Sequence, residues 1–232
     1  MVPTGPDGRL DCVQQMVVHN EVAALRARCV EYGPTPDGVE DVGLVQLAAA
    51  YGYADMLALL LEFRTDPRAD AATRAFDAPL RLVCGTSATP PDPPAQTGHA
   101  APQEGAAPRV RDYTAVARML VAAGADVHCC DGHGRTPLHC TALDGGFEVA
   151  SLLVEQGARL GDVDCTGRTA MHLAALQANV PMVLLLLACG ADLTAQDNTG
   201  STPVDLAVQH QLAPRVCKLL QHRRVPGAGR AR

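Results

Sequence analysis

The segment 128–140, HCCDGHGRTPLHC, contains three histidines and three cysteines within thirteen residues. Side chains of these types bind zinc or form catalytic nucleophile–base pairs. A zinc site needs four ligands, which usually come in pairs with C-x2–4-C or H-x3–5-H spacing. His128 and His133 have the second spacing, but the chain contains no CxxC. The adjacent Cys129 and Cys130 point to opposite sides of an extended segment and cannot easily bind one ion, so we favour a structural or partner-binding role.

The sequence also lacks the common motifs of catalytic and cofactor sites. It contains no GxGxxG dinucleotide motif, no GxxxxGK phosphate loop, no GxSxG nucleophile turn and no HExxH zinc motif. We therefore expect no enzymatic activity, no cofactor, no bound metal and no small-molecule substrate.

Composition restricts the class of protein further. Hydrophobic residues make up 47% of the sequence, but aromatic residues only 3%, and tryptophan is absent. A core of Leu, Val, Ala and Met favours closely packed helices over a β-sandwich. The formal net charge of −6 argues against a nucleic-acid partner. The longest apolar run, residues 183–189, is too short to span a membrane.

Charge and cysteine content bear on the location of the protein. Residues 206–232 hold six basic and no acidic side chains, so the remaining residues carry −12. The start of the chain, MVPTGPDGRLDC, lacks the apolar segment of a signal peptide. Nine cysteines without such a signal are typical of reduced thiols. We expect a cytoplasmic protein, with the nucleus as a further location.

Several residue types recur with a period of 33 residues. The residues that keep this period form five series: Gly124, Gly157 and Gly190; Gly134, Gly167 and Gly200; Asp131, Asp164 and Asp197; Thr136, Thr169 and Thr202; and Leu120, Leu153 and Leu186. A fixed period of this length predicts stacked repeats, in which each unit buries its apolar face against its neighbours.

With this period, a TPLH sequence at 136–139 and GAD segments before the turns, the chain resembles the ankyrin repeat family. The resemblance implies an all-α repeat solenoid of helix–turn–helix units joined by β-hairpin loops, with about five repeats plus a degenerate N-terminal cap. Local chemistry agrees with it. Thr136 suits a helix N-cap and Pro137 the first helical position. Gly145 suits the turn between the two helices, and Glu148 the start of the second.

The pattern weakens toward the N-terminus. Residues 43–63 align with a helix pair that has Gly52 at its turn. Residues 78–84 align with a further first helix, with Pro79 at its first position, and residues 112–126 with its partner helix.

The resulting division of the chain has three parts and one insertion. We assign residues 1–37 to the degenerate cap, 38–222 to the repeat domain and 223–232 to a basic, disordered tail. An insertion at 86–111 separates the two helices of one repeat. It holds six prolines and no Leu, Ile, Phe or Met, so we expect it to be disordered.

The resemblance also gives roles to individual side chains. His139 and His172 occupy the histidine position of TPLH, where the imidazole typically joins the threonine hydroxyl and backbone groups in hydrogen bonds. Cys84 and Cys140 fall on first helices at positions expected in the core. Asp205 replaces the histidine in the last repeat, as suits a C-terminal cap.

In the ankyrin family, partner contacts usually come from the loops and first helices. Carried over to this chain, these positions are His133, Arg135, Leu143, Asp144, Cys165, Thr166, Arg168, Leu176, Gln177, Asn198, Thr199, Ser201, Gln209 and His210. The set mixes arginines with polar and apolar groups, which suits a protein surface better than a small-molecule pocket. We predict a non-enzymatic protein–protein interaction module that binds one or more proteins through the concave face of the repeat stack. It would act as an adaptor, a scaffold or an inhibitory or regulatory subunit.

Two other interpretations stay open. The first is a redox- or metal-responsive module that uses the cluster 128–133 together with Cys165. The second is a regulatory subunit of an enzyme complex that docks through the insertion 86–111.

Overall fold

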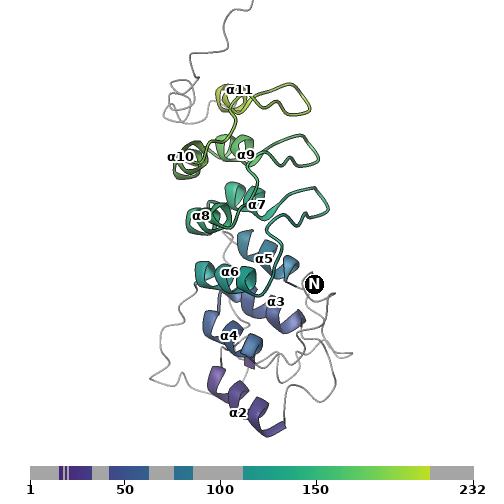
Figure 1. The fold of residues 1–232 in the computed structure, drawn as a ribbon, viewed down its shortest axis with the longest axis vertical. Coiled ribbons are helices and arrows are strands. Elements are labelled where there is room, and N and C mark those ends of the chain that lie inside the picture. The colour runs from purple at the N-terminus through teal and green to yellow at the C-terminus, as the bar shows by residue number, and fades with distance from the viewer. Residues whose placement is uncertain are drawn as a thin grey trace, which may run out of the picture. The chain divides into compact units, whose positions relative to one another are not determined.

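The computed structural model describes residues 16–17, 19, 21–32, 42–62, 76–85 and 112–209. The regular elements in these ranges are all helices (Figure 1), as the sequence predicts. The chain divides into two compact units, Met1–Asp126 and Val127–Arg232. The predicted insertion 86–111 and the predicted tail 223–232 lie outside the described residues, as does much of the predicted cap 1–37.

The first unit contains five of the described helices. They are α2 (Val22–Tyr32), α3 (Val42–Tyr51), α4 (Ala54–Glu62), α5 (Asp77–Cys84) and α6 (Tyr113–Ala122). Each of the predicted pairs packs together, α3 with α4 and α5 with α6. Helix α3 also packs on α5, α4 on α6, and α2 on α4. First helices therefore contact first helices and second helices contact second helices, as stacking of repeats requires.

Helix α5 begins earlier than the sequence predicts. The first helical residue is Asp77, and the N-cap is Phe76, whose side chain makes no capping hydrogen bond. Pro79 therefore stands third in the helix, and the prediction that it occupies the first position is wrong. A proline is tolerated there because the first four N–H groups of a helix have no partner within it.

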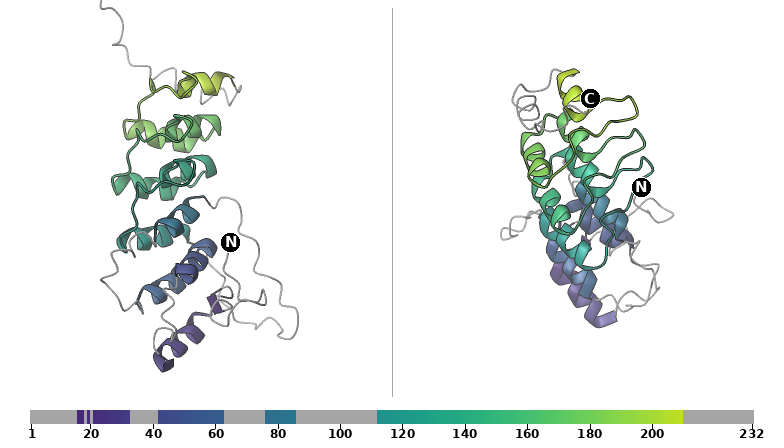
Figure 2. Two further views of the ribbon diagram at one scale, coloured as in Figure 1. Left: turned by 90° about the vertical axis from the view of Figure 1, so that its right-hand side faces the viewer. Right: turned by 45° about the horizontal axis from the view of Figure 1, so that its top comes forward.

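The second unit contains the other five helices. They are α7 (Pro137–Asp144), α8 (Phe147–Glu155), α9 (Ala170–Leu176), α10 (Val180–Ala188) and α11 (Pro203–Gln209). Helix α9 packs on α7, α10 and α11, and α8 packs on both α7 and α10. The loops that precede α7, α9 and α11 project on the same side of this unit (Figures 1 and 2).

The core of the second unit consists of aliphatic side chains from consecutive repeats. Leu138, Leu153, Met171, Leu186 and Leu206 are all at most 3% exposed. Burial of one such side chain contributes about 1.5–3 kcal/mol to stability, so the contacts between repeats hold the stack together.

One of the two cysteines predicted to lie in the core does so. Cys84 is 2% exposed, whereas Cys140 is only half-buried, so its prediction is wrong. Leu173, at the equivalent position of the next repeat, is buried. The smaller thiol thus leaves a position partly open that a leucine fills one repeat later.

The loops between repeats are tight turns, and no β-strand is found among the described residues. Each loop is closed by a backbone hydrogen bond across it, from Asp131 N to Arg135 O at 3.0 Å and from Asp164 N to Arg168 O at 2.9 Å, and the glycine amide inside each loop adds a turn bond back to the aspartate carbonyl. The third loop repeats this bond from the amide of Asp197. One closing bond and one turn bond make too short a ladder to count as a strand pair, so the predicted β-hairpins are hairpin-shaped turns.

The turns between paired helices use the left-handed backbone region. Gly145 lies between α7 and α8 at φ +91°, as predicted. Ala178 occupies the equivalent place between α9 and α10 at φ +53°. A side chain with a Cβ is strained in this region, so the repeat without the glycine keeps the turn at a cost in free energy.

Candidate functional site

The loops of the second unit are folded around their aspartate side chains. Oδ1 of Asp197 accepts hydrogen bonds from Thr199 N at 2.9 Å, Ser201 N at 3.0 Å and Thr199 Oγ1 at 2.6 Å. Oδ1 of Asp164 has the same three kinds of donor one repeat earlier. Burial by itself would raise the pKa of Asp197, but the bonds from Thr199 and Ser201 outweigh it and lower that pKa to about 2. The loops therefore carry a built-in negative charge that fixes their shape.

The two predicted TPLH histidines are buried and join one repeat to the next. Nδ1 of His139 lies 3.2 Å from Thr136 N and 2.8 Å from Thr136 Oγ1, and Nε2 lies 3.0 Å from the carbonyl oxygen of Arg168. His172 makes the same contacts with Thr169 and with the carbonyl oxygen of Ser201. Since the amide donates to Nδ1 and a carbonyl can only accept, the ring proton belongs on Nε2.

Burial gives these histidines a structural role. It lowers the pKa of His139 and of His172, and the nearby carbonyl groups and aspartates compensate only in part. The neutral ring is therefore the form that fits the hydrogen bonds. Both rings are almost fully buried, so neither can reach a substrate in this structure.

Asp205 takes the histidine position in the last described repeat and makes a cap of its own. Its Oδ2 accepts from Thr202 N at 3.0 Å and from Thr202 Oγ1 at 2.6 Å. A carboxylate has no ring N–H with which to donate onward. The series of histidine bonds to a following loop therefore ends at this residue.

The His/Cys cluster divides between the interior and the surface. Cys129 is buried, while Cys130 and His133 are exposed, in agreement with the opposite directions expected for adjacent cysteines. His128 Nδ1 lies 3.8 Å from Asp162 Oδ2, which makes an ion pair when the ring is protonated. In the ranges that the structure describes, no group of three or more His, Cys, Asp or Glu side chains could hold a metal ion.

The predicted partner-binding residues all come from the second unit, and those described are all at least partly accessible. His133, Cys165, Thr166, Gln177, Asn198, Thr199 and Gln209 are exposed, and Arg135, Leu143, Asp144, Arg168, Leu176 and Ser201 are of intermediate exposure. His210 lies outside the described residues. We call the thirteen described residues the loop-tip surface.

Hydrogen bonds between neighbouring loops make this surface continuous. Cys165 N donates to His133 O at 2.9 Å, and one period later Asn198 N donates to Thr166 O at 3.0 Å. The side chain of Asn198 adds a bond from Nδ2 to Cys165 O at 3.1 Å. Helix contacts α7·α9 and α9·α11 bring the C-terminal ends of the first helices into the same row. The surface is therefore held in place before any partner arrives.

One loop position is missing from the contact positions carried over from the family. Cys130, Val163 and Gln196 directly precede the three loop aspartates, and all three are exposed, Val163 to 54%. The residue type at this position differs in every repeat. Such variation within a regular pattern is the signal that could have added these residues from the sequence.

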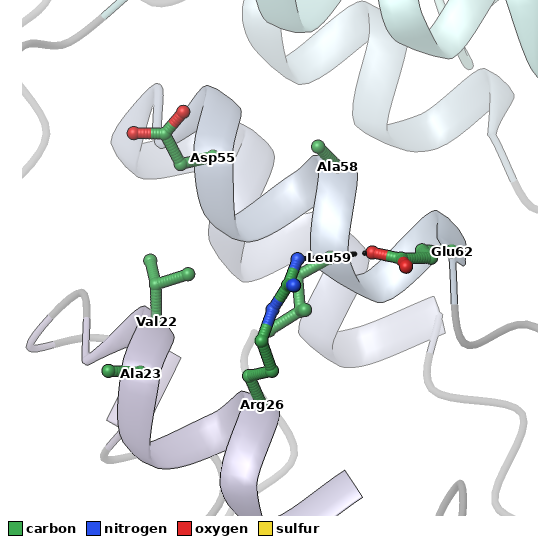
Figure 3. Close-up of a pocket in the computed structure, with 7 residues that line it drawn as sticks. All are labelled: Val22, Ala23, Arg26, Asp55, Ala58, Leu59 and Glu62. Atoms are coloured by element: carbon green, nitrogen blue, oxygen red, sulfur yellow. Dashed lines mark hydrogen bonds and ion pairs between the residues drawn. The ribbon is translucent and has the colours of Figure 1, made fainter. Parts of the chain in front are cut away.

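A shallow groove in the first unit does not resemble a catalytic site. It has a volume of about 550 Å³ and lies between α2 and α4 (Figure 3), lined by Val22, Ala23, Arg26, Asp55, Ala58, Leu59 and Glu62. Arg26 and Glu62 form an ion pair across it at 3.2 Å, with both side chains 60% exposed. An ion pair this exposed contributes little to stability, and the lining contains no Ser, Thr, Cys, His or Lys.

Comparison with known proteins agrees with the arrangement of paired helices and loops. Residues 105–197 match the family model for ankyrin repeats, in three copies. The match covers α6 to α10 and begins within the segment predicted as an insertion. No curated protein matches the chain. Among the described residues, no helix is both long and apolar enough to cross a membrane.

Proposed function

Because residues 105–197 of this chain are ankyrin repeats, we propose that the protein is a non-enzymatic module that binds one or more partner proteins on the loop-tip surface. The observation that carries the proposal is the continuity of that surface. Three consecutive loops are joined to one another by backbone hydrogen bonds, while their outward side chains stay accessible.

The rigidity of the loops favours binding. Each loop is folded around its own aspartate and tied to a neighbouring repeat by a buried histidine or by backbone bonds. A partner that docks on a preformed surface does not have to order it, and this saves free energy on association. The same rigidity fixes the distances between contact positions, which is a basis for specificity.

The chemistry of the loop-tip surface suits a protein partner. It combines two arginines, two leucines and several amide and hydroxyl side chains, a mixture typical of protein interfaces. The partner would be met in the cytoplasm or nucleus, where the module would serve as an adaptor, a scaffold or an inhibitory or regulatory subunit. Docking of an enzyme through residues 86–111 stays a prediction, since that segment lies outside the described residues.

Affinity purification of the tagged full-length chain, followed by mass spectrometry, tests the proposal. The test variants are Gln177→Arg and Gln209→Arg, which place a bulky charge on the loop-tip surface at side chains that make no hydrogen bond with the described residues. The matched controls are Gln156→Arg and Ala188→Arg, which change exposed residues at the ends of the second helices.

Partners that bind this surface should no longer copurify with the two loop-tip variants but should still copurify with the two control variants. An affinity loss of about tenfold or more is expected where a contact at the centre of an interface is blocked. Partners that survive both loop-tip variants but are lost with the controls would place the interface elsewhere.

A further inference from the structure

Two arginines at equivalent positions of consecutive loops differ in the hydrogen bonding of their Nε atoms. Arg168 Nε donates to Asp197 Oδ2 of the following loop at 3.4 Å, and the Asp197 side chain is only 1% exposed. Arg135 stands one period earlier. Its Nε is buried, yet within the described part of the chain it has no hydrogen-bond partner. The sequence period predicts the same environment for both arginines, but their environments in the structure differ.

The nearby aspartates bind donors of their own loops through Oδ1, and neither accepts a hydrogen bond from Arg135 Nε. Oδ1 of Asp164, the counterpart of Asp197, accepts from the amides of Thr166 and Arg168 and from the Thr166 hydroxyl. Oδ1 of Asp131 accepts from the backbone amides of His133 and Arg135. Burial by itself would raise the pKa of Asp131, but these backbone bonds and the charges of His133 and Arg135 lower it, although Arg135 Nε makes no hydrogen bond with that carboxylate.

An acceptor from outside the chain would complete this partly exposed arginine once its side chain turns the buried Nε toward the surface. A buried N–H without an acceptor costs free energy, which is recovered when one is supplied. A carboxylate fits best, since the planar guanidinium can bind it through two parallel hydrogen bonds. Asp144 is the only acidic residue of the loop-tip surface, so few groups there compete with an incoming carboxylate.

We propose that Arg135 receives an aspartate or glutamate side chain of the partner protein, whereas Arg168 is held by Asp197 and serves the fold. This inference rests on the proposed function. The net charge of −6 favours one carboxylate on a protein segment over a nucleic acid, because a polyanion is repelled by the acidic chain as a whole.

The test uses short random peptides displayed on phage and selected on the full-length chain. Peptides that lose binding to Gln177→Arg but not to Gln156→Arg are synthesised and measured by fluorescence polarisation against the wild type, Arg135→Gln and Arg168→Gln. Circular dichroism checks that each variant is folded. Each acidic residue of a peptide is replaced in turn by its amide.

At one acidic position of the peptide, replacement by the amide should lower its affinity for the wild-type chain about tenfold. The unchanged peptide should lose about the same affinity when it binds Arg135→Gln. Combining the two changes should lose no more than either alone, because both remove one contact. When Arg168→Gln is the binding protein, replacing the acidic residue of the peptide by its amide should still lower the affinity by the same factor as with the wild type. Equal binding to wild type and Arg135→Gln, or losses that simply add, would overturn the proposal.

Failure of this inference is distinguishable from failure of the proposed function. Peptides that depend on Gln177 but not on Arg135 overturn the role of Arg135 and leave the loop-tip surface intact. Selection of no Gln177-dependent peptide overturns both. Tighter, Arg135-dependent binding of a labelled single-stranded oligonucleotide would replace the carboxylate with a phosphate and overturn the proposal.

Discussion

Nε2 of His139 donates a hydrogen bond to the carbonyl oxygen of Arg168 at 3.0 Å, so a buried side chain of one repeat holds the loop of the next. The same ring accepts from the amide at the start of its own helix. One residue thus connects the helix start, the stacking of repeats and the position of the loop-tip surface.

Removal of this ring should destabilise the fold. His139→Ala leaves the Thr136 amide without its partner, removes one of the two hydrogen bonds to the Arg168 carbonyl and opens a cavity. We therefore expect a loss of about 2–4 kcal/mol in the free energy of unfolding. Asp205→Ala removes an exposed cap and should cost about 1 kcal/mol. Urea unfolding followed by circular dichroism measures both, and equal losses would contradict the bridging role of His139.

Stability should fall as the pH drops below neutrality. Burial holds the pKa of His139 and of His172 below the ordinary value of 6.5, so the unfolded chain binds the proton more readily. Their contribution is complete above pH 6.5 and is lost as the pH falls from there through the folded pKa, with Asp162, Asp164 and Asp197 opposing the loss. Each histidine adds at most about 1.4 kcal/mol per pH unit.

The control for this pH dependence is a side chain that does not titrate. His139→Gln and His172→Gln should be less stable at pH 7 but should show a flatter decline between pH 6.5 and 5. A second decline, below pH 3.8, belongs to the aspartates with lowered pKa values and should persist in both variants. An unchanged slope between pH 6.5 and 5 would show that the histidines do not control it.

Substitutions at two glycines separate the effect of contact between neighbouring loops from the effect of backbone conformation. Gly167 and Gly200 both have positive φ, +76° and +78°, but only at Gly167 would a Cβ meet the next loop, 2.8 Å from Asn198 N. Gly200→Ala should cost about 1–2 kcal/mol for the backbone conformation alone. Gly167→Ala should cost clearly more, and similar melting curves for the two variants would show that the loops do not stack closely.

Replacement of the strained turn residue should stabilise the protein. Ala178 adopts φ +53° where the preceding repeat has Gly145. Ala178→Gly should raise the free energy of unfolding by about 0.5–1 kcal/mol, because glycine adopts this conformation without steric cost. Gly145→Ala should lower it by a similar amount. Thermal unfolding of both variants gives the comparison, and a destabilised Ala178→Gly would mean that the turn is not strained.

The sequence predicted helix boundaries and turns most accurately where the backbone conformation requires a particular residue type. Thr136 and Pro137 mark the start of α7 because capping and proline geometry are local, and Gly145 marks the turn for the same reason. In the first unit, the start of α5 was misplaced because Phe76 offers no capping side chain. Local signals there are weak, and packing sets the boundary.

The details of the loop-tip surface lay beyond the sequence. A period of 33 makes Arg135 and Arg168 equivalent, yet only Arg168 finds an acceptor in the following loop. Which donor meets which acceptor depends on distances of a few tenths of an ångström, and a repeat pattern does not contain them. The number of repeats beyond the three that match the family stays a prediction.

The most direct test of the account is site-specific photo-crosslinking in cells. A photoreactive residue is placed at Gln177 on the loop-tip surface or at Gln156 at the end of α8, and crosslinked proteins are identified by mass spectrometry. We predict specific crosslinks from position 177 that are absent from position 156. Specific crosslinks from position 156 with none from position 177 would contradict the claim that partners bind the loop-tip surface.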